Sequence, residues 1–382
     1  MEDAVSAALT PVKPSEIEAA LAALWRPAQA HGAVMPALTR ACMSNLIVYC
    51  DDAARAAEVM EDLPHVVRSH PARVLTLIDD SEAGVPQAAV STQRVSDDRG
   101  HQVVCEQVVL RARAVSLSSL ARPLLLGDIP TSLWWAPPMA PPDGGRLFVD
   151  LARMADQVIY DSIDWHDPVA AMIATAGWAS RPEILTAADL AWRRLKPWRR
   201  LLSQGLDPAV VPGALASLSE VEIEHGPHAL PQAWLLMGWL AGRLNWQPVG
   251  GQVRSDHELS WELRGPRGPV RAIAHRLAAA DEWQLRRVTV RWKTGASSLA
   301  ASFARDAQRL VATYAQAIAQ PRSIAAPLPS RAALLARQLP DLTRDEVFVT
   351  TLGLARQMAL AVYAGGKDKR PIWVTGLKGD NR

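Results

Sequence analysis

The sequence predicts an α/β protein with a Rossmann-like, mixed-sheet N-terminal domain, a second α+β domain and a helical C-terminal segment. A strand–helix–strand pattern over residues 39–79 predicts a parallel strand pair joined by a right-handed crossover. A turn signal at residues 96–100, between two apolar runs, predicts a hairpin. Three successive strands over residues 253–293 predict an antiparallel sheet in the second domain.

The first elements follow from caps and apolar runs. Ser15 and Glu18 form a capping-box pattern that predicts a helix over residues 16–26. Residues 39–50 contain four consecutive apolar residues, which is typical of a buried strand. A helix then starts at Asp51 or Asp52 and ends at Leu63, because Pro64 is expected to stop it. The other strands expected in this domain are 73–79, 87–95, 102–113, 129–135 and 157–160, with helices at 116–125 and 147–155.

The second half is expected to begin with helices. The elements expected after residue 168 are helices to 205, a strand at 221–224, a helix at 233–244, strands at 253–263, 269–276 and 285–293, a helix at 295–320, a linker at 321–329 and a helix to about 363. The expected division is 1–34 as an N-terminal helical segment, 35–180 as the Rossmann-like domain, 181–325 as the α+β domain, and 326–382 as a helical segment with a basic tail beyond 365.

Composition indicates a globular protein of a reducing compartment. Of 382 residues, 49% are hydrophobic and 21% charged, and the net charge is +2. This balance gives no electrostatic reason to expect nucleic acid or a membrane surface as partner. Three cysteines argue against a disulfide framework. The N-terminus has no apolar signal-peptide region and no apolar run approaches the roughly 18 residues of a membrane span. We therefore expect a cytoplasmic location.

Motifs for catalysis are missing from the sequence. It contains no glycine-rich phosphate loop and no G-x-S-x-G elbow. Acidic and imidazole side chains do crowd together at Glu222, Glu224, His225 and His228. Alternate strand residues face opposite sides, however, and Gly226-Pro227 interrupts any helix, so we expect no metal site there. No cofactor and no catalytic residue are expected.

Two polar sets leave alternatives open. Asp161, Asp164, His166 and Asp167 follow a strand, where α/β folds bind ligands. Asp167 before Pro168 also reads as a helix N-cap. The second set consists of polar residues in the first domain, which could line a sugar-phosphate pocket or form structural hydrogen bonds. Its members are Asn45, His70, Arg73, Gln93 and Glu106.

The most unusual segment is TAADLAWRRLKPWRRLLSQG, residues 186–205. It predicts a kinked helix with Thr186 as cap, Asp189 at the third position and Gly205 just past the end. Its Trp and Arg content resembles a protein interface, and the other interpretation is a basic face over a tryptophan core. The candidate contact residues are Trp192, Arg193, Trp198 and Arg199, followed by Trp134 and Trp135.

Several of these stretches resemble one family. They are RACMSNLIVYC (40–50), HPARVLTL (70–77), STQ (91–93), CEQVVL (105–110), PLLLGDIPTSLWW (123–135), DQVIYDS (156–162), DLAWRRLKPWRRLL (189–202) and LLMGWLAGRLNW (235–246). In this order they resemble the glucose-6-phosphate dehydrogenase assembly protein family, OpcA. The two tryptophan-rich strings are the most specific part of the resemblance.

The resemblance implies a bacterial, two-domain, non-catalytic protein. Its partner would be glucose-6-phosphate dehydrogenase, whose active oligomer it would promote as an allosteric activator. NADPH supply through the oxidative pentose phosphate pathway would be the purpose. The alternative, from the polar strand residues, is a sugar-phosphate-binding enzyme or metabolite sensor that uses the N-terminal domain.

Overall fold

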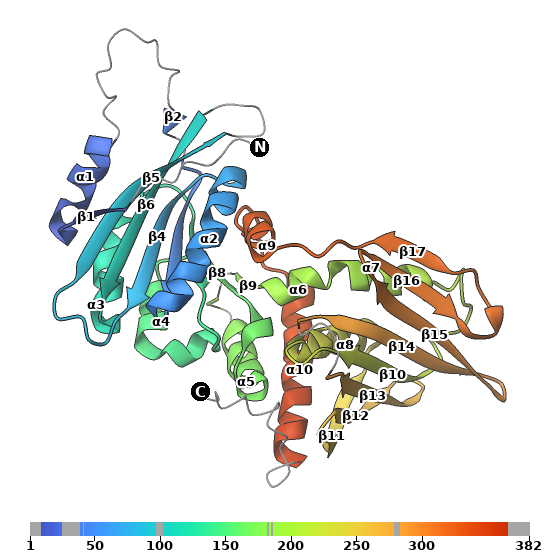
Figure 1. The fold of residues 1–382 in the computed structure, drawn as a ribbon. Helices are drawn as coiled ribbons and strands as arrows, with labels where there is room; N and C mark the ends of the chain where they lie inside the picture. Colours follow the sequence, from blue (N-terminus) through green and yellow to red (C-terminus); the bar gives the residue numbers. More distant parts are fainter. Residues whose placement is uncertain are drawn as a thin grey trace.

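The computed structural model describes residues 9–24, 39–40, 42–96, 102–181, 183–184, 186–278 and 283–365. Two sheet-containing domains lie side by side, and the C-terminal helices return to both of them (Figure 1). The predicted turn residues 97–100, the last two residues of the first predicted helix and the predicted tail beyond residue 365 lie outside the described residues.

The first sheet has the strand order β1-β5-β6-β4-β3-β7-β8-β9, with β2 paired to β6. Its strands are β1 (Thr10–Val12), β2 (Thr39–Arg40), β3 (Ser44–Cys50), β4 (Ala72–Asp79), β5 (Gln87–Ser96), β6 (Gln102–Ala112), β7 (Thr131–Trp135), β8 (Gln157–Tyr160) and β9 (Ala187–Asp189). The six strands from β6 to β9 are parallel. Taken in chain order they run 3-2-1-4-5-6, the order of dinucleotide-binding folds. The predicted Rossmann-like mixed sheet is confirmed.

Helices cover both faces of this sheet. On one face lie α3 (Ala114–Ala121), α4 (Gly145–Ala152) and α5 (Pro168–Ala179), which share a core with Ile47, Leu75 and Leu133. On the other face lie α2 (Ala53–Ser69) and, from the far end of the chain, α9 (Arg331–Gln338). The C-terminal segment therefore completes the N-terminal domain. Helix α1 (Ile17–Leu24) packs against β5 and buries Ile17 and Leu21 in the core that α3, α4 and α5 share. The short helical turns of this domain are η1 (Pro14–Glu16), η2 (Arg122–Leu124), η3 (Pro141–Gly144) and η4 (Ser162–Asp164).

The second sheet is almost entirely antiparallel. Its order is β11-β12-β13-β10-β14-β15-β16-β17, and only the β10–β13 pair is parallel within it. The strands are β10 (Leu218–His225), β11 (Gln247–Ser255), β12 (Glu258–Gly265), β13 (Gly268–Arg276), β14 (Leu285–Thr294), β15 (Ser297–Asp306), β16 (Arg309–Tyr314) and β17 (Arg322–Ala325), followed by α9; η5 (Ala315–Ala317) precedes β17. The predicted α+β second domain is confirmed.

The helix expected over residues 295–320 is wrong. The segment forms β15 and β16, because its buried residues alternate: Ala301 and Phe303 on the first strand, Leu310 and Ala312 on the second. Pairing to β14 outweighs the helix propensity of its alanines. The strand expected over 253–263 is likewise two strands, β11 and β12, joined by a turn at Asp256.

Pro64 does not end its helix. It lies inside α2, which continues to Ser69. Val66 and Val67 beyond it are buried against the sheet, so packing of the apolar stripe compensates for the lost backbone hydrogen bond. Ser15 likewise lies within η1, and Lys13 holds the N-cap position, so the expected capping box is wrong.

The helix α10 (Glu346–Gly365) joins the domains. It packs against α5 of the first domain and against α8 (Leu230–Leu244) and β11 of the second. By length and composition its residues Glu346–Ala364 are apolar enough to cross a membrane, which corrects the expectation that no stretch approaches this. Phe348, Leu352 and Met358 are buried in the common core, so α10 is a core helix here.

Candidate functional site

A crevice of about 600 Å³ lies between the domains, at the carboxyl ends of β3, β7 and β8. This is where the strand order of the parallel sheet reverses, the position at which such folds bind ligands. Its walls come from α2, the end of β7, the turn after β8, helix α6 (Leu190–Arg194) and the strap, our name for residues 326–330 between β17 and α9. We call it the interdomain crevice.

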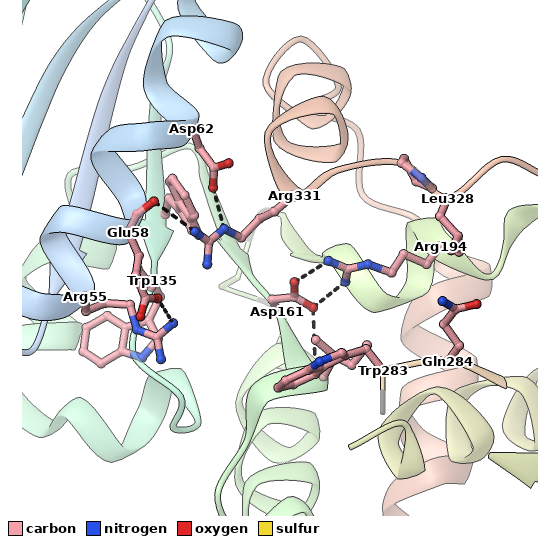
Figure 2. Close-up of a pocket in the computed structure, with 14 residues that line it drawn as sticks. Arg55, Glu58, Asp62, Trp135, Asp161, Arg194, Trp283, Gln284, Leu328 and Arg331 are labelled. Carbon is pink, nitrogen blue, oxygen red and sulfur yellow. Dashed lines mark hydrogen bonds and ion pairs between the residues drawn. The ribbon is translucent and has the colours of Figure 1, made fainter. Parts of the chain in front are cut away.

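Charges in the interdomain crevice are paired internally (Figure 2). Arg55 reaches Glu58 at 2.9 Å. Arg331 of α9 reaches Asp62 of α2 at 2.5 Å. Arg194 makes two bonds to Asp161, of 2.6 and 2.7 Å. Each arginine is thus balanced by a carboxylate, and the crevice presents no net positive charge from these six side chains to attract a phosphate.

The N-terminus of α2 is occupied by its own cap. Asp52 Oδ1 accepts from the Arg55 N–H at 2.7 Å. Dinucleotide-binding folds place a glycine-rich turn and a phosphate at the corresponding helix N-terminus, which donates its free N–H groups. Here the turn reads Cys50-Asp51-Asp52-Ala53, without glycine and with two carboxyl groups. These residues do not fit a pyrophosphate.

Arg73 and Glu106 form a buried structural ion pair. Arg73 Nη2 lies 2.6 Å from Glu106, and both side chains are almost completely buried. Arg73 also donates to the Leu124 carbonyl at 2.7 Å and pairs with Glu18 of α1 at 2.7 Å. This network ties α1 and η2 to the sheet, so its donors are used within the fold.

The other three residues of this polar set are also used internally. Asn45 donates to the Leu126 carbonyl at 2.9 Å and accepts the Leu126 N–H at 2.9 Å. His70 Nε2 lies 3.1 Å from Ser44 Oγ, and burial lowers its pKa. Gln93 donates to Gln107 at 3.3 Å. None of the five residues lines the interdomain crevice, and the hydrogen bonds that they make within the fold fit the interpretation as structural groups.

Comparison with known proteins identifies the family. Residues 64–176 match the family described as glucose-6-phosphate dehydrogenase subunit N-terminal domain, and residues 186–352 match its C-terminal domain. The chain belongs to the OpcA glucose-6-phosphate dehydrogenase assembly family. Two similar curated proteins carry the OpcA name, from Synechocystis sp. (28% identity over 245 residues) and Nostoc punctiforme (33% over 162).

The alignments with these OpcA proteins are partial. They cover 61% and 41% of this chain, and 50% and 34% of the relatives, so the chain spans half or less of their length. Among solved structures, biliverdin reductase from Synechocystis sp. has a TM-score of 0.45 at 13% identity, covering 84% of this chain and 99% of that one. Myo-inositol 2-dehydrogenase from Lactobacillus plantarum has a TM-score of 0.44 at 12%, covering 85% and 97%. Likeness at this level says nothing about activity or ligand.

The tryptophan-rich OpcA segment is a core segment. Instead of one helix it forms β9, α6 and α7 (Lys196–Gly205). Asp189, not Thr186, is the N-cap, and its side chain accepts the Ala191 N–H. Gly205 is the last residue of α7, where an added Cβ would lie 2.5 Å from Phe303. Sheet pairing of residues 187–189 with β8 replaces the expected first helical turn.

Trp192 and Trp198 are 6% and 2% exposed, so the expectation that they form an exposed contact surface is wrong. The Trp192 indole N–H donates to Asp345, and Arg199 stacks 3.2 Å from its ring centre. Burial lowers the pKa of Arg199 to about 10, which leaves it charged at neutral pH. Arg193 is partly exposed but bonded to Asp341 at 2.6 Å.

Trp134 and Trp135 are also buried, at 1% exposure each. Neighbours on a strand face opposite sides, and here both sides are covered. Trp134 packs under α9, with Arg331 5.6 Å from its ring centre, whereas Trp135 stacks on Tyr49 at 4.4 Å. The expectation that Trp134 and Trp135 are exposed contact residues is therefore also wrong, because both side chains are buried.

The acidic and imidazole clusters have structural roles. Glu222 pairs with Arg291 at 3.0 Å and Glu224 with Arg287 at 3.2 Å, whereas His228 stacks on Trp283. Within the described residues no group of three metal-type ligands converges. Asp167 caps α5 by accepting the Ala170 N–H at 3.0 Å, which confirms the N-cap interpretation.

Sequence reasoning missed the long-range partners that build the crevice. Arg331 and Trp283 carried no local signal, since a lone arginine after a proline-rich stretch and a lone tryptophan are unremarkable in sequence. Asp161 is among the candidate residues of the sequence, but nothing in the sequence pairs it with Arg194, which lies in the basic segment 186–205. The bidentate geometry of this pair exists only because α6 returns to the end of β8.

Proposed function

We propose that this chain is a non-catalytic partner of glucose-6-phosphate dehydrogenase that promotes its active assembly. The observation that carries the proposal is that both halves of the chain match, in order, the two domains of a family described as a subunit of that enzyme. The similar OpcA proteins have names that associate them with the OxPP cycle. The proposed benefit is NADPH supply in a bacterial cytoplasm.

The geometry of the interdomain crevice supports a role without chemistry. The crevice occupies the ligand position of a Rossmann fold, yet its three arginines face three carboxylates and its helix N-terminus is capped by Asp52. The strap and α9 cover the region from the C-terminal side. A fold of this kind is suited to act through its surface.

Activation by such a partner is a matter of differential affinity. An activator shifts the dehydrogenase toward its active oligomer only as far as it binds that state more tightly than the others. The proposal therefore requires that complex formation and activity rise together with the concentration of this chain.

The test is a titration of the purified chain into the matching dehydrogenase, with oligomer size and turnover followed in parallel. We expect a complex by size-exclusion chromatography and an increase in activity that saturates at the same stoichiometry. A dehydrogenase from an unrelated organism serves as control. Absence of both a complex and any change in turnover contradicts the proposal, and so does chemical change of a substrate by this chain alone.

The buried tryptophans also change how the binding surface must be sought. Replacing Trp198 by Ala would leave a core cavity and cost about 3–5 kcal/mol of folding free energy, so weakened binding in that variant would report unfolding. Surface scanning has to use exposed residues instead.

A further inference from the structure

A second cavity, of about 240 Å³, lies beside the interdomain crevice and is strongly basic. It is enclosed by the start of α7, β15, the strap and α9, and it shares Arg194 and Trp283 with the crevice. Its lining residues include six cations, and none of the described lining residues is acidic. We call it the basic cavity.

Three of the six cations are available to bind an anionic ligand. Lys196 and Arg200 at the start of α7 and Arg337 on α9 are exposed, and none has an ion pair with a carboxylate among the described residues. Arg305 of β15 also lines the cavity, and it donates to the Ala326 carbonyl of the strap at 2.9 Å. By contrast, Arg193 and Arg194 are already bonded to Asp341 and Asp161.

We propose that the basic cavity is a binding site for a compact phosphorylated metabolite. Cations from three separate elements converge on it, which suits the oxygens of a phosphate group. A half-exposed indole, Trp283 at 42%, stands at the rim and offers an apolar face to a sugar ring. The volume lies below the roughly 300–1,000 Å³ of most ligand pockets, which favours a sugar phosphate over a dinucleotide.

Because of the position of the cavity, ligand binding would affect how α7 and α9 are held together. Lys196 and Arg200 belong to the segment that leads into the second domain, whereas Arg337 lies on the helix that covers α2 of the first. Mutual repulsion among these like charges is relieved when an anion binds between them. The ligand would therefore hold α9 and α7 together and raise the melting temperature.

The experiment is isothermal titration of the full chain with glucose 6-phosphate, glucose and inorganic phosphate, at low and at physiological salt. We expect heat from glucose 6-phosphate, a weaker response to inorganic phosphate, none from glucose, and an affinity that falls with added salt. Arg200→Glu and Arg337→Glu should each reduce the affinity about tenfold or more. Arg264→Glu, an exposed site on β12, makes the same charge change away from the cavity and should leave binding intact.

Two results overturn the proposal. One is silence from both phosphorylated probes. The other is binding that is equal in the wild type, Arg200→Glu and Arg337→Glu. If these variants instead lose the dehydrogenase while no phosphorylated probe binds the wild type, the cavity is part of the partner interface and the metabolite site is wrong. Since metabolite binding is measured without the dehydrogenase, its failure is distinguishable from failure of the assembly function.

Discussion

Asp189 is a buried carboxyl group at the point where the two domains meet. It caps α6 by accepting the Ala191 N–H at 2.8 Å, and it accepts the Ser162 N–H at 3.1 Å. Burial, reinforced by the neighbouring Asp161, raises the pKa of Asp189 to about 7. The unfolded chain titrates this group near 3.8, so the folded state binds its proton more tightly across the whole interval between the two values.

The sign of the effect on stability follows from this difference. The contribution of Asp189 to folding is fully present below its unfolded pKa and is lost as pH rises through its folded value, at about 1.4 kcal/mol for each unit of difference. Asp189→Asn keeps an acceptor oxygen for the cap but does not titrate. We expect the stability of the variant relative to wild type to rise between pH 4 and pH 7 and then level off.

Urea unfolding of both proteins at several pH values measures this difference. His225 titrates in the same range with the opposite sign, because burial lowers its pKa to about 4. It is present in both proteins and cancels in the comparison. Parallel stability curves for wild type and Asp189→Asn would show that Asp189 is ionised throughout, as in the unfolded chain.

At the scale of elements, the second tryptophan-rich string illustrates close helix packing. LLMGWLAGRLNW forms most of α8, whose Gly238 faces α10. A Cβ built on Gly238 would lie 2.7 Å from the Thr351 carbonyl oxygen. The two backbones approach each other too closely for any side chain at this position, which explains a glycine inside a helix in spite of its low helix propensity.

Gly238→Ala should therefore destabilise the protein by about 1–3 kcal/mol through overpacking. Gly353, on α10, is the matched control because a Cβ there meets no atom within 4 Å. Gly353→Ala should stabilise by about 0.5–1 kcal/mol. Thermal unfolding of the two variants measures both, and equal shifts of the melting temperature would contradict the packing argument.

At the scale of the whole molecule, α9 links the second domain to the first. The chain leaves β17, passes along the strap and packs α9 on α2. Arg331 anchors this contact through Asp62 and the Glu58 carbonyl, with the Trp134 ring beneath it. The anchor is partly exposed, so solvent screens its charge.

A double-mutant cycle with Arg331→Ala and Asp62→Ala tests whether the two residues act together. We expect a coupling energy of up to about 1 kcal/mol, as for partly exposed pairs, and faster amide exchange in α9 for each single variant. Additive effects of the two substitutions would mean that α9 is held by its apolar contacts alone, among them Leu335 and Leu339.

The sequence determined much of the parallel sheet by itself. Strands such as β3 are continuous apolar runs between polar residues, and caps such as Asp167 lie directly before the helices they start. These patterns can be recognised within a short stretch of sequence, because a strand that is buried on both faces contains few polar residues. The helix expected at 295–320 failed where local alanine content and non-local pairing disagreed.

Only the tertiary structure decided which charged and aromatic residues face solvent. Trp134 is buried by α9, which lies about 200 residues further along the chain. The charge of Arg194 is balanced by Asp161, which lies beside it at the end of β8. Periodicity within one segment carries no information about a partner that distant. For this reason the sequence indicated the family and the fold class, whereas the location of the crevice and of the basic cavity came from packing.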